Sequence, residues 1–475
     1  MERVSRERVT FYLLLMTAAA ISGCSKSSFL DKKPDTRLVV PASVADFQAL
    51  LDDQYVMQET PELGELSTDD YYITYSSWQS FKTAKSQNAY TWAKDIYNGQ
   101  HLIYDWNDPY QQVFYANVVL DGLKRMNLDT VDRLRWNAVC GSAYFIRAYA
   151  FYNLSQVFAS VYDSSTAVSD MGIPLPLVPD VNAKFTRASV HDTYSQILTD
   201  LGEADSLLLS TQVDMNFLNR PSRPAVQALL ARIYLSVGAY DQAWINADRC
   251  LQLYDSLIMY NSGKDIAIGS NNPIKQTNPE TLYQSVLLSS SEILGGGLVK
   301  ATCIVDSNLY ALYRDGDLRK KVFYRVSTST NVPTLKGSYF GSSFCFSGLA
   351  VDEVYLIRAE CAARAGNKVA ALADLNHLLE HRWDSTFVPV AALTADDARD
   401  SILLERRKEL AFRGLRWSDL RRLNKKDANI TIYHGLNGKV YTLPAKSLNY
   451  VLPIPPDVLD FNKGLMSDNP RVDIN

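Results

Sequence analysis

The sequence contains few of the features that mark membrane-spanning or nucleic-acid-binding proteins. After residue 23, no apolar run approaches the roughly 20 residues that a membrane-spanning helix needs. Any membrane attachment is therefore expected to be through lipid. Lys and Arg number 48 against 52 Asp and Glu, and this near-balance excludes a dominant basic face. We expect no nucleic-acid partner.

Cysteines are scarce, and the familiar catalytic motifs are missing. The six cysteines include no CxxC spacing, so neither a zinc knuckle nor a disulfide framework is predicted. Cys140, Cys250 and Cys361 lie among alanines in helical patterns and are expected in the core. The chain contains no G-x-S-x-G, Walker or G-x-G-x-x-G motif. We expect no cofactor, no metal and no enzymatic activity.

The first 24 residues have the pattern of a bacterial lipoprotein signal. Three arginines precede a short apolar segment, residues 9–21, which ends in small residues directly before Cys24. This is the order of a secretory signal peptide, and a cysteine after Ser-Gly resembles a lipobox, in which that cysteine is lipidated. We predict a signal peptide over residues 1–23 and a lipid anchor with a tether over residues 24–43. An ordinary signal peptide with an incidental cysteine is the alternative.

The rest of the chain is predicted to be mainly α-helical. Between residues 134 and 158, apolar side chains recur at steps of three and four, which is typical of a helix with one buried face. The first two well-defined helices are expected at 113–126 and 134–158, and a later helix is expected to begin with a capping box from Thr394 to Asp397. The C-terminal tail is expected to be extended and proline-rich. Other segments are rich in Ser, Gly, Asn and Tyr, with short β-branched runs that indicate loops and small strands. We predict one domain over residues 44–475, with a helical scaffold at 111–259 and 349–424 and loop-rich ligand-face segments at 62–110 and 260–348.

Two glycines mark a repeated helix pair. Five residues after Gly238 and Gly366 lie Ala243 and Ala371, and apolar residues recur at equivalent spacings beyond them. Each glycine also follows a helical stretch that contains Tyr and Ala. A helix, a glycine turn and an alanine-faced helix resemble a tetratricopeptide unit, in which small residues let paired helices pack closely. We predict a scaffold of tetratricopeptide-like pairs that carries insertions.

The aromatic composition favours a recognition surface. The chain contains 28 Tyr, 17 Phe and 7 Trp, and Tyr combines an apolar face with a polar edge. Such faces pack against the C–H side of pyranose rings, while amides and carboxylates bond to the ring edge. Packing in the core is the alternative role. The candidate ligand-binding residues form two sequence clusters: Tyr71, Tyr72, Tyr75 and Trp78, and Tyr339 and Phe340.

Five motifs occur in order along the mature chain: FLDKKPDT at 29–36, WNDPY at 106–110, RAYAFYNL at 147–154, RPAVQALLARIYL at 223–235 and ERRKELAFRGLRWSDLRR at 405–422. In this order they resemble the SusD/RagB family of outer-membrane nutrient-binding lipoproteins. The resemblance implies a SusD-like fold with four tetratricopeptide-like helix pairs and a loop-rich ligand face. We interpret the charged 405–422 block as salt-bridged helix faces and not as an anion site.

The resemblance also implies a function. It predicts capture of a nutrient, most simply an oligo- or polysaccharide, and its delivery to a SusC-like TonB-dependent transporter from a lipid anchor in the cell outer membrane. We expect the protein to face the cell surface. The run Ser25-Lys26-Ser27-Ser28 lacks the acidic residues that surface-exported relatives often carry, so an inward-facing anchor is the alternative. No shared motif fixes the ligand contacts.

Two other functions remain open from the sequence. The RagB branch of the resemblance allows capture of a peptide in place of a glycan. His377-Leu378-Leu379-Glu380-His381 matches H-x-x-E-H, which would make a surface metal-dependent hydrolase if a third ligand were nearby. Two histidines close to a helix C-terminus also suit the helix dipole without any metal, and this is the interpretation we favour.

Overall fold

The computed structural model describes residues 41–129, 131–211, 213–294, 302–328, 330–426 and 428–474. The described residues from Val44 onward make up one compact unit. The predicted signal peptide, Cys24 and most of the predicted tether lie outside the described residues.

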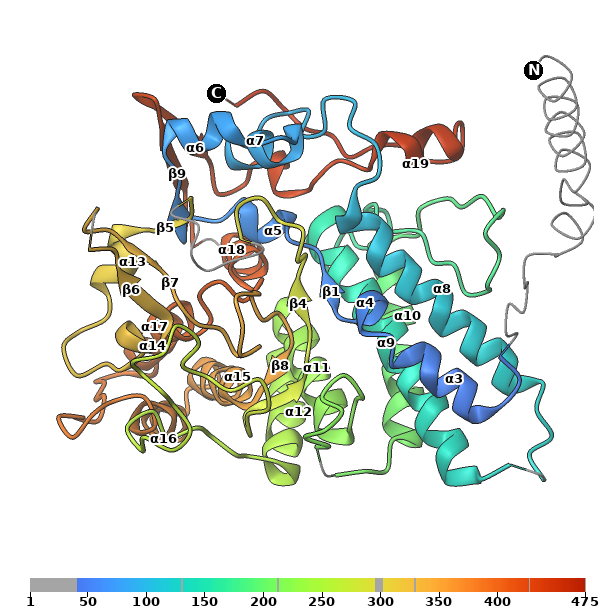
Figure 1. Ribbon diagram of the computed structural model, residues 1–475, viewed down its shortest axis with the longest axis horizontal. Coiled ribbons are helices and arrows are strands. Elements are labelled where there is room, and N and C mark those ends of the chain that lie inside the picture. Colours follow the sequence, from blue (N-terminus) through green and yellow to red (C-terminus); the bar gives the residue numbers. More distant parts are fainter. Residues whose placement is uncertain are drawn as a thin grey trace, which may run out of the picture. The chain divides into compact units, whose positions relative to one another are not determined.

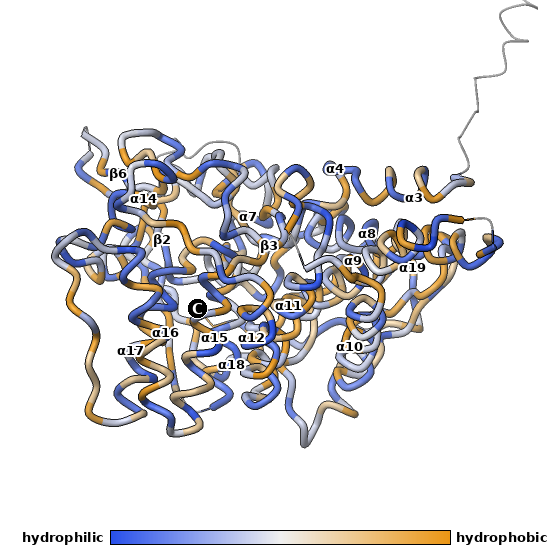
Figure 2. The backbone as a smooth tube through the Cα atoms, turned by 90° about the horizontal axis from the view of Figure 1, so that it is seen from below, coloured by the Kyte–Doolittle hydropathy of each residue, from blue (hydrophilic) through white to orange (hydrophobic). Residues whose placement is uncertain are grey.

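The described chain is mainly helical, as predicted (Figure 1). Along α16 (Lys368–Glu380) and α17 (Ala395–Glu409), hydrophobic and hydrophilic residues alternate, as expected of helices with one buried face (Figure 2). The helices are α3 (Val44–Leu51), α4 (Gln54–Met57), α5 (Leu63–Leu66), α6 (Tyr75–Ser80), α7 (Ala84–Tyr90), α8 (Tyr104–Lys124), α9 (Arg133–Phe158), α10 (Val190–Leu207), α11 (Arg223–Ser236), α12 (Tyr240–Leu253), α13 (Ser307–Ala311), α14 (Arg319–Phe323), α15 (Val351–Arg364), α16 (Lys368–Glu380), α17 (Ala395–Glu409), α18 (Arg416–Lys425), the 3-10 turn η1 (Leu448–Tyr450) and α19 (Pro456–Phe461).

The two glycine turns separate helix pairs as the sequence predicts. Gly238, between α11 and α12, has φ +78°, and Gly366, between α15 and α16, has φ +80°. Glycine adopts this left-handed backbone without the steric penalty of a side chain. Five residues on, Ala243 and Ala371 are fully buried, so each second helix packs closely against its partner. The predicted tetratricopeptide-like pairing is confirmed.

A local capping signal sets the start of α17, whereas the start of α8 has no side-chain cap. The predicted capping box of α17 is present: Thr394 accepts a hydrogen bond from the backbone of Asp397, whose carboxylate bonds back to the Thr394 amide. Helix α8 begins at Tyr104, nine residues before the expected start at Val113, and includes Pro109. Proline removes one backbone hydrogen bond and weakens the sequence signal for a helix. Burial of Trp106 in this first part of α8 favours the helix.

Short strands join loop-rich segments that are distant in sequence. The strands are β1 (Glu59–Thr60), β2 (Tyr71–Tyr72), β3 (Thr281–Tyr283), β4 (Val286–Leu287), β5 (Ile304–Val305), β6 (Tyr324–Val326), β7 (Pro333–Leu335), β8 (Leu349–Ala350), β9 (Ile432–Leu436) and β10 (Lys439–Leu443). Strand β1 pairs with β4, and the small sheet β2-β5-β7-β6 begins with β2. Both predicted loop-rich segments therefore contribute to the four-stranded sheet.

A β-hairpin of β9 and β10 lies near the C-terminus, where we expected an extended, proline-rich tail. Its register pairs Ile432 with Leu443 and Leu436 with Lys439, around a turn at Asn437 and Gly438. Both turn residues have positive φ, 50° and 77°. Asn-Gly is the strongest two-residue hairpin signal, so this element was open to prediction from the sequence.

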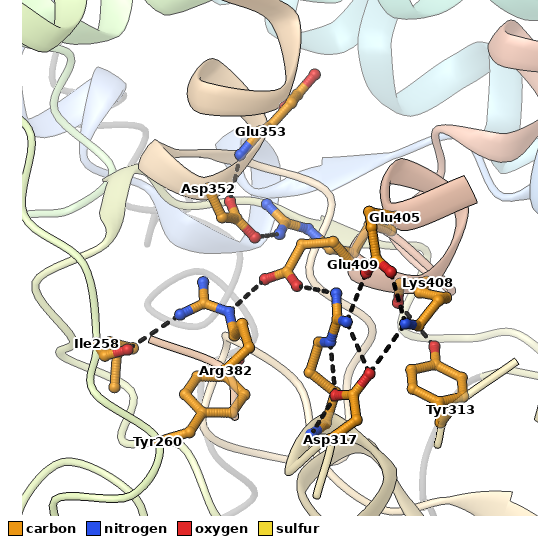
Figure 3. A network of polar contacts seen from close by, with 12 residues as sticks. Ile258, Tyr260, Tyr313, Asp317, Asp352, Glu353, Arg382, Glu405, Lys408 and Glu409 are labelled. Carbon is orange, nitrogen blue, oxygen red and sulfur yellow. Dashed lines mark hydrogen bonds and ion pairs between the residues drawn. The ribbon is translucent and has the colours of Figure 1, made fainter. Parts of the chain in front are cut away.

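A buried ionic network connects the loop-rich insertion to the C-terminal helices (Figure 3). Glu409 of α17 accepts hydrogen bonds from Arg382 Nε at 2.7 Å and from Arg319 Nη1 at 2.9 Å. Arg382 also donates to Glu280 at 2.8 Å, and Arg319 donates to Asp317 at 2.7 Å. All five side chains are fully buried. The interpretation of the 405–422 block as salt-bridged structure is confirmed.

Candidate functional site

Two of the predicted ligand-binding aromatics lie in the core. The Tyr71 hydroxyl donates to Leu66 O at 2.7 Å, and the side chain is 1% exposed. Tyr339 is 2% exposed, and its hydroxyl lies 3.2 Å from Arg382 Nη2, which donates to it. Neither ring offers a free face, because tertiary packing covers both. Phe340 is half-buried, and its ring packs edge-on against Phe344 at 6.0 Å.

Tyr75 and Trp78 form a stacked pair on the surface helix α6. The helix is capped by Thr74, whose hydroxyl accepts from Ser77 N, and α6 contains no buried residue. Residues three apart lie on the same helix face. The two ring planes differ by only 15°, with centroids 5.8 Å apart, and Tyr75 is 38% exposed. This pair has the flat aromatic surface that a sugar ring requires.

Hydrogen bonds fix the pair in place. Trp78 Nε1 donates to Gln87 O at 3.0 Å, and Gln87 Nε2 donates back to Trp78 O at 3.1 Å, which joins α6 to α7. The connection between these helices is held by Glu292, which accepts from the backbone N–H groups of Lys82 at 2.6 Å and Thr83 at 3.0 Å. A surface fixed before binding loses little conformational entropy when a ligand arrives.

A polar cleft adjoins the start of α6. Tyr72 of β2 lines it, and only Ile73 separates Tyr72 from the Thr74 cap of α6. Its volume of about 640 Å³ is within the range of small-ligand sites. The lining mixes aromatic, amide and carboxylate groups: Asp69, Tyr71, Tyr72, Asp306, Asn308, Leu309, Leu312, Leu404, Arg407, Thr431, Ile432, Tyr433, His434 and Gly435.

The β9–β10 hairpin contributes Tyr433, which the sequence analysis did not identify. Its side chain is 60% exposed on the cleft wall, and Gly435, two residues on, lies on the same face of the strand. A Cβ added at Gly435 would meet no atom within 4 Å, so open space lies over this position. The Asn-Gly turn with alternating residues around it was the signal that could have identified Tyr433.

His434 holds the hairpin against the loop-rich region. Its ring stacks between Tyr90 and Trp92, with centroids at 4.0 and 4.4 Å. Its two nitrogens lie 2.6 Å from Tyr90 O and 2.8 Å from Thr68 O. Burial lowers the pKa of the His434 ring, although the two carbonyl contacts favour protonation. Tyr433 is therefore held in place by the next residue of its strand, His434, whose ring is packed on both faces.

The adjacent carboxyls at the cleft, Asp69 and Asp70, have different electrostatic surroundings. Burial opposes ionisation of Asp69, but Arg416 and Arg407, at 2.8 Å each, lower its pKa. Burial, with repulsion from Asp69, raises the pKa of Asp70 to about 6 even though Arg407 is near. Asp69 is thus an ion-paired carboxylate, and Asp70 is 1% exposed. This arrangement does not resemble two open carboxyls flanking a scissile bond.

The two histidines of the H-x-x-E-H motif lie at the end of α16. Their ring centroids are 4.9 Å apart, and His381 Nδ1 lies 2.8 Å from His377 O. Burial, together with nearby His381, lowers the pKa of His377. Within the described residues, no group of three His, Cys, Asp or Glu side chains is placed to bind a metal ion.

Comparison with known proteins establishes the family. Residues 28–235 match a family described as "Starch-binding associating with outer membrane", and residues 352–471 match the SusD family. The chain belongs to the SusD family. Its match to the SusD-like protein P2 of Formosa agariphila is 24% identical and covers 98% of this chain and 100% of the relative.

Solved structures with the SusD fold resemble this chain over most of its length. A SusD-like carbohydrate-binding protein from Bacteroides vulgatus has a TM-score of 0.68 at 19% identity, covering 91% of this chain and 99% of the other. A laminarin-binding SusD-like protein has a TM-score of 0.63 at 20% identity, covering 90% and 98%. Within the described residues of this SusD family protein, no helix has the length and hydropathy of a membrane span.

Proposed function

We propose that this SusD family protein binds an oligosaccharide on the Tyr75–Trp78 pair and in the adjoining cleft. The observation that carries the proposal is the near-parallel stacking of the exposed Tyr75 ring on the half-buried Trp78 ring, on a helix fixed by hydrogen bonds. Sugar rings stack on such faces, and the edges of the sugar need hydrogen-bonding groups. Asn308 and Asp306 on the cleft wall supply amide and carboxylate oxygens for these bonds.

The volume and shape of the cleft support a glycan fragment of a few residues. Tyr433 provides a second exposed ring, and open space lies over Gly435 beside it. Two aromatic positions separated by polar groups fit a chain of pyranose units, with one ring face on each aromatic side chain. The kinship with a carbohydrate-binding and a laminarin-binding structure agrees with a glycan ligand.

A glycan and peptide array tests this proposal directly. The full-length protein, purified in detergent, is applied to arrays of plant, algal and host oligosaccharides and of peptides. Binding to a set of related glycans, competed by the free glycan in solution, is the expected result. Binding to peptides alone would replace the glycan with a peptide ligand, which the RagB branch of the family allows.

We further propose that the protein is lipidated at Cys24 in the outer membrane, faces the cell surface and hands its ligand to a SusC-like TonB-dependent transporter. The lipobox and the family membership support this arrangement. Metabolic labelling with an alkyne fatty acid is expected to mark the wild-type protein but not the Cys24→Ser variant. Protease treatment of intact cells is expected to degrade it, and affinity purification from detergent-solubilised cells is expected to recover the transporter.

The proposed role is binding without catalysis. His377 and His381 are the alternative on which a metal-dependent hydrolase would depend, and each already has a structural contact at the end of α16. Stoichiometric zinc in the purified protein, together with cleavage of a bound glycan, would overturn the non-catalytic proposal. Loss of that cleavage in a His377→Ala variant would assign it to the motif.

A further inference from the structure

A small polar cavity lies where the loop-rich region meets the helical scaffold. Its walls come from α5, α9, α18 and the turn before α18, through Glu65, Asn153, Trp417 and Arg413. Its volume is about 40 Å³. A cavity needs a volume of roughly 10–15 Å³ to hold one water molecule. This cavity is therefore suited to one monatomic ion or a few water molecules. Polyatomic anions and sugars are too large.

Unpaired hydrogen-bond donors are concentrated on the residues that line this cavity. Among the described residues, Arg413 Nε and Nη2, Trp417 Nε1 and Asn153 Nδ2 are buried and have no hydrogen-bond partner. Arg413 and Trp417 are only 5% and 1% exposed. Buried donors without a partner are strongly unfavourable, and a cluster of them requires an occupant that accepts hydrogen bonds.

The balance of donors and acceptors indicates the charge of the occupant. The residues that line the cavity carry these four unpaired donor atoms and one unpaired acceptor, Glu65 Oε1. A water molecule accepts two hydrogen bonds and must donate its own, whereas a halide accepts from all its neighbours and donates none. We propose that this cavity binds a chloride ion between the side chains of Arg413, Trp417 and Asn153. Arg413 and Trp417 belong to the 405–422 block, so this proposal departs at these two residues from the interpretation of the block as salt-bridged structure without an anion site.

The one carboxyl in the cavity is compatible with an anion. Glu65 Oε2 accepts a hydrogen bond from Gly414 N at 3.0 Å, which leaves Oε1 as the oxygen that carries a proton when the group is neutral. Burial, with repulsion from Asp70, raises the pKa of Glu65 well above its ordinary range. In its neutral form, the Glu65 carboxyl adds a fifth donor. The bound ion would connect α5 to α9 and α18, and the chain continues from α5 to Asp69 of the proposed glycan cleft.

Bromide substitution provides the direct test. Crystals of the full-length protein soaked in sodium bromide are expected to show an anomalous peak in this cavity, within hydrogen-bond reach of Arg413 and Trp417. A cavity that shows only water density under these conditions would overturn the proposal. The result does not depend on glycan binding, so failure here and failure of the proposed function are separate outcomes.

Thermal stability gives a second readout in solution. At equal ionic strength and pH, the melting temperature is expected to be about 2 °C or more higher in sodium chloride than in sodium gluconate, because gluconate is too large for the cavity. The Trp417→Phe variant, which lacks the N–H donor, is expected to lose most of this difference. Trp136→Phe is the matched control, because Trp136 Nε1 already donates to Leu123 O at 3.3 Å, and it should keep the full difference. Equal melting temperatures of the wild-type protein in both salts would contradict chloride binding.

Discussion

Arg382 and Glu409 form an ion pair with Nε 2.7 Å from Oε1, and both side chains are completely buried. Arg382 is also bonded to Glu280, so it compensates two buried carboxylates at once. Removing one member of such a network leaves buried charge without compensation. We expect Arg382→Met to reduce the free energy of unfolding by about 3–5 kcal/mol, measured by urea denaturation.

An exposed ion pair supplies the control for this prediction. Arg399 bonds to Asp396 and Asp400, whose side chains are 79% and 69% exposed. Surface pairs of this kind contribute about 1 kcal/mol or less, so Arg399→Ala should change stability by no more than that. Similar losses for the two variants would show that burial of the Arg382 network has little energetic effect.

The stacked pair on α6 makes a prediction about binding without loss of fold. Trp78→Ala and Tyr75→Ala are each expected to weaken glycan binding at least tenfold, measured by calorimetry with the best array ligand. The melting temperature of Tyr75→Ala should stay close to that of the wild type, because Tyr75 is 38% exposed. Trp78→Ala is expected to lower the melting temperature, because Trp78 packs against the core and donates to Gln87 O, so Tyr75→Ala separates binding from stability. Trp244→Ala on α12 is the matched control, since this tryptophan is 40% exposed and lies outside the proposed site. Unchanged affinity in the Trp78 variant would exclude this surface as the site.

A bulky side chain at the hairpin is expected to weaken glycan binding by filling the cleft. Gly435 has open space at its Cβ position, so Gly435→Leu should fold normally while its side chain occupies the cleft beside Tyr433. We expect glycan affinity to fall by more than tenfold with little change in melting temperature. Gly269→Leu, at another glycine with open space around it, should leave affinity unchanged. Normal binding by the Gly435 variant would confine the ligand to α6.

The half-buried Asp108 predicts a defined pH dependence of stability. Burial, with repulsion from Glu59 and Asp105, raises its pKa from 3.8 to about 7 in the folded protein. The folded state therefore holds this proton more tightly than the unfolded state, so the contribution of Asp108 to stability falls as the pH rises from about 4 to about 7. The Asp108→Asn substitution removes this pH-dependent contribution to stability. Urea unfolding across that range should show the variant gaining stability relative to the wild type, with the difference constant above about pH 7.

Asp397 contrasts with Asp108, because folding lowers its pKa. Hydrogen bonds from Thr394 lower its pKa below 3.8, so its charge stabilises the α17 cap above about pH 4. The deficit of an Asp397→Asn variant should therefore be fully developed by about pH 4 and constant up to pH 7. A difference that changes between pH 4 and 7 in both variants would point to another titrating group.

Local patterns predicted the scaffold well because its helices are fixed by nearby residues. The Gly238 and Gly366 turns, the burial of Ala243 and Ala371 and the Thr394 cap were all readable from spacing. The candidate site depends on contacts that no local pattern contains. Nothing near Tyr71 in the sequence shows that its ring is covered, because its neighbours Tyr90 and His434 come from distant segments.

The exposed aromatics also show that local sequence patterns do not predict how side chains from different segments come together. Tyr75 and Trp78 were identified as candidates, but their stacking depends on a short helix whose only local signal is the Thr74 cap. Tyr433 was missed although the Asn-Gly turn was visible, because the tail was interpreted as extended. Its contribution to the cleft is apparent only after His434 is placed between Tyr90 and Trp92.

The packing of His434 between Tyr90 and Trp92 has a consequence for the order in which the chain can fold. His434 contacts Thr68 and Tyr90 across separations of 366 and 344 residues, whereas the helix pairs of the scaffold form from neighbouring segments. Contacts between distant segments form slowly, because closing a long loop is entropically unfavourable. The helix pairs can assemble while the chain is still being synthesised, but the aromatic region stays incomplete until the hairpin arrives. A chain truncated before residue 432 should therefore retain much of its helix content while Tyr90 and Trp92 lose the ring that packs between them.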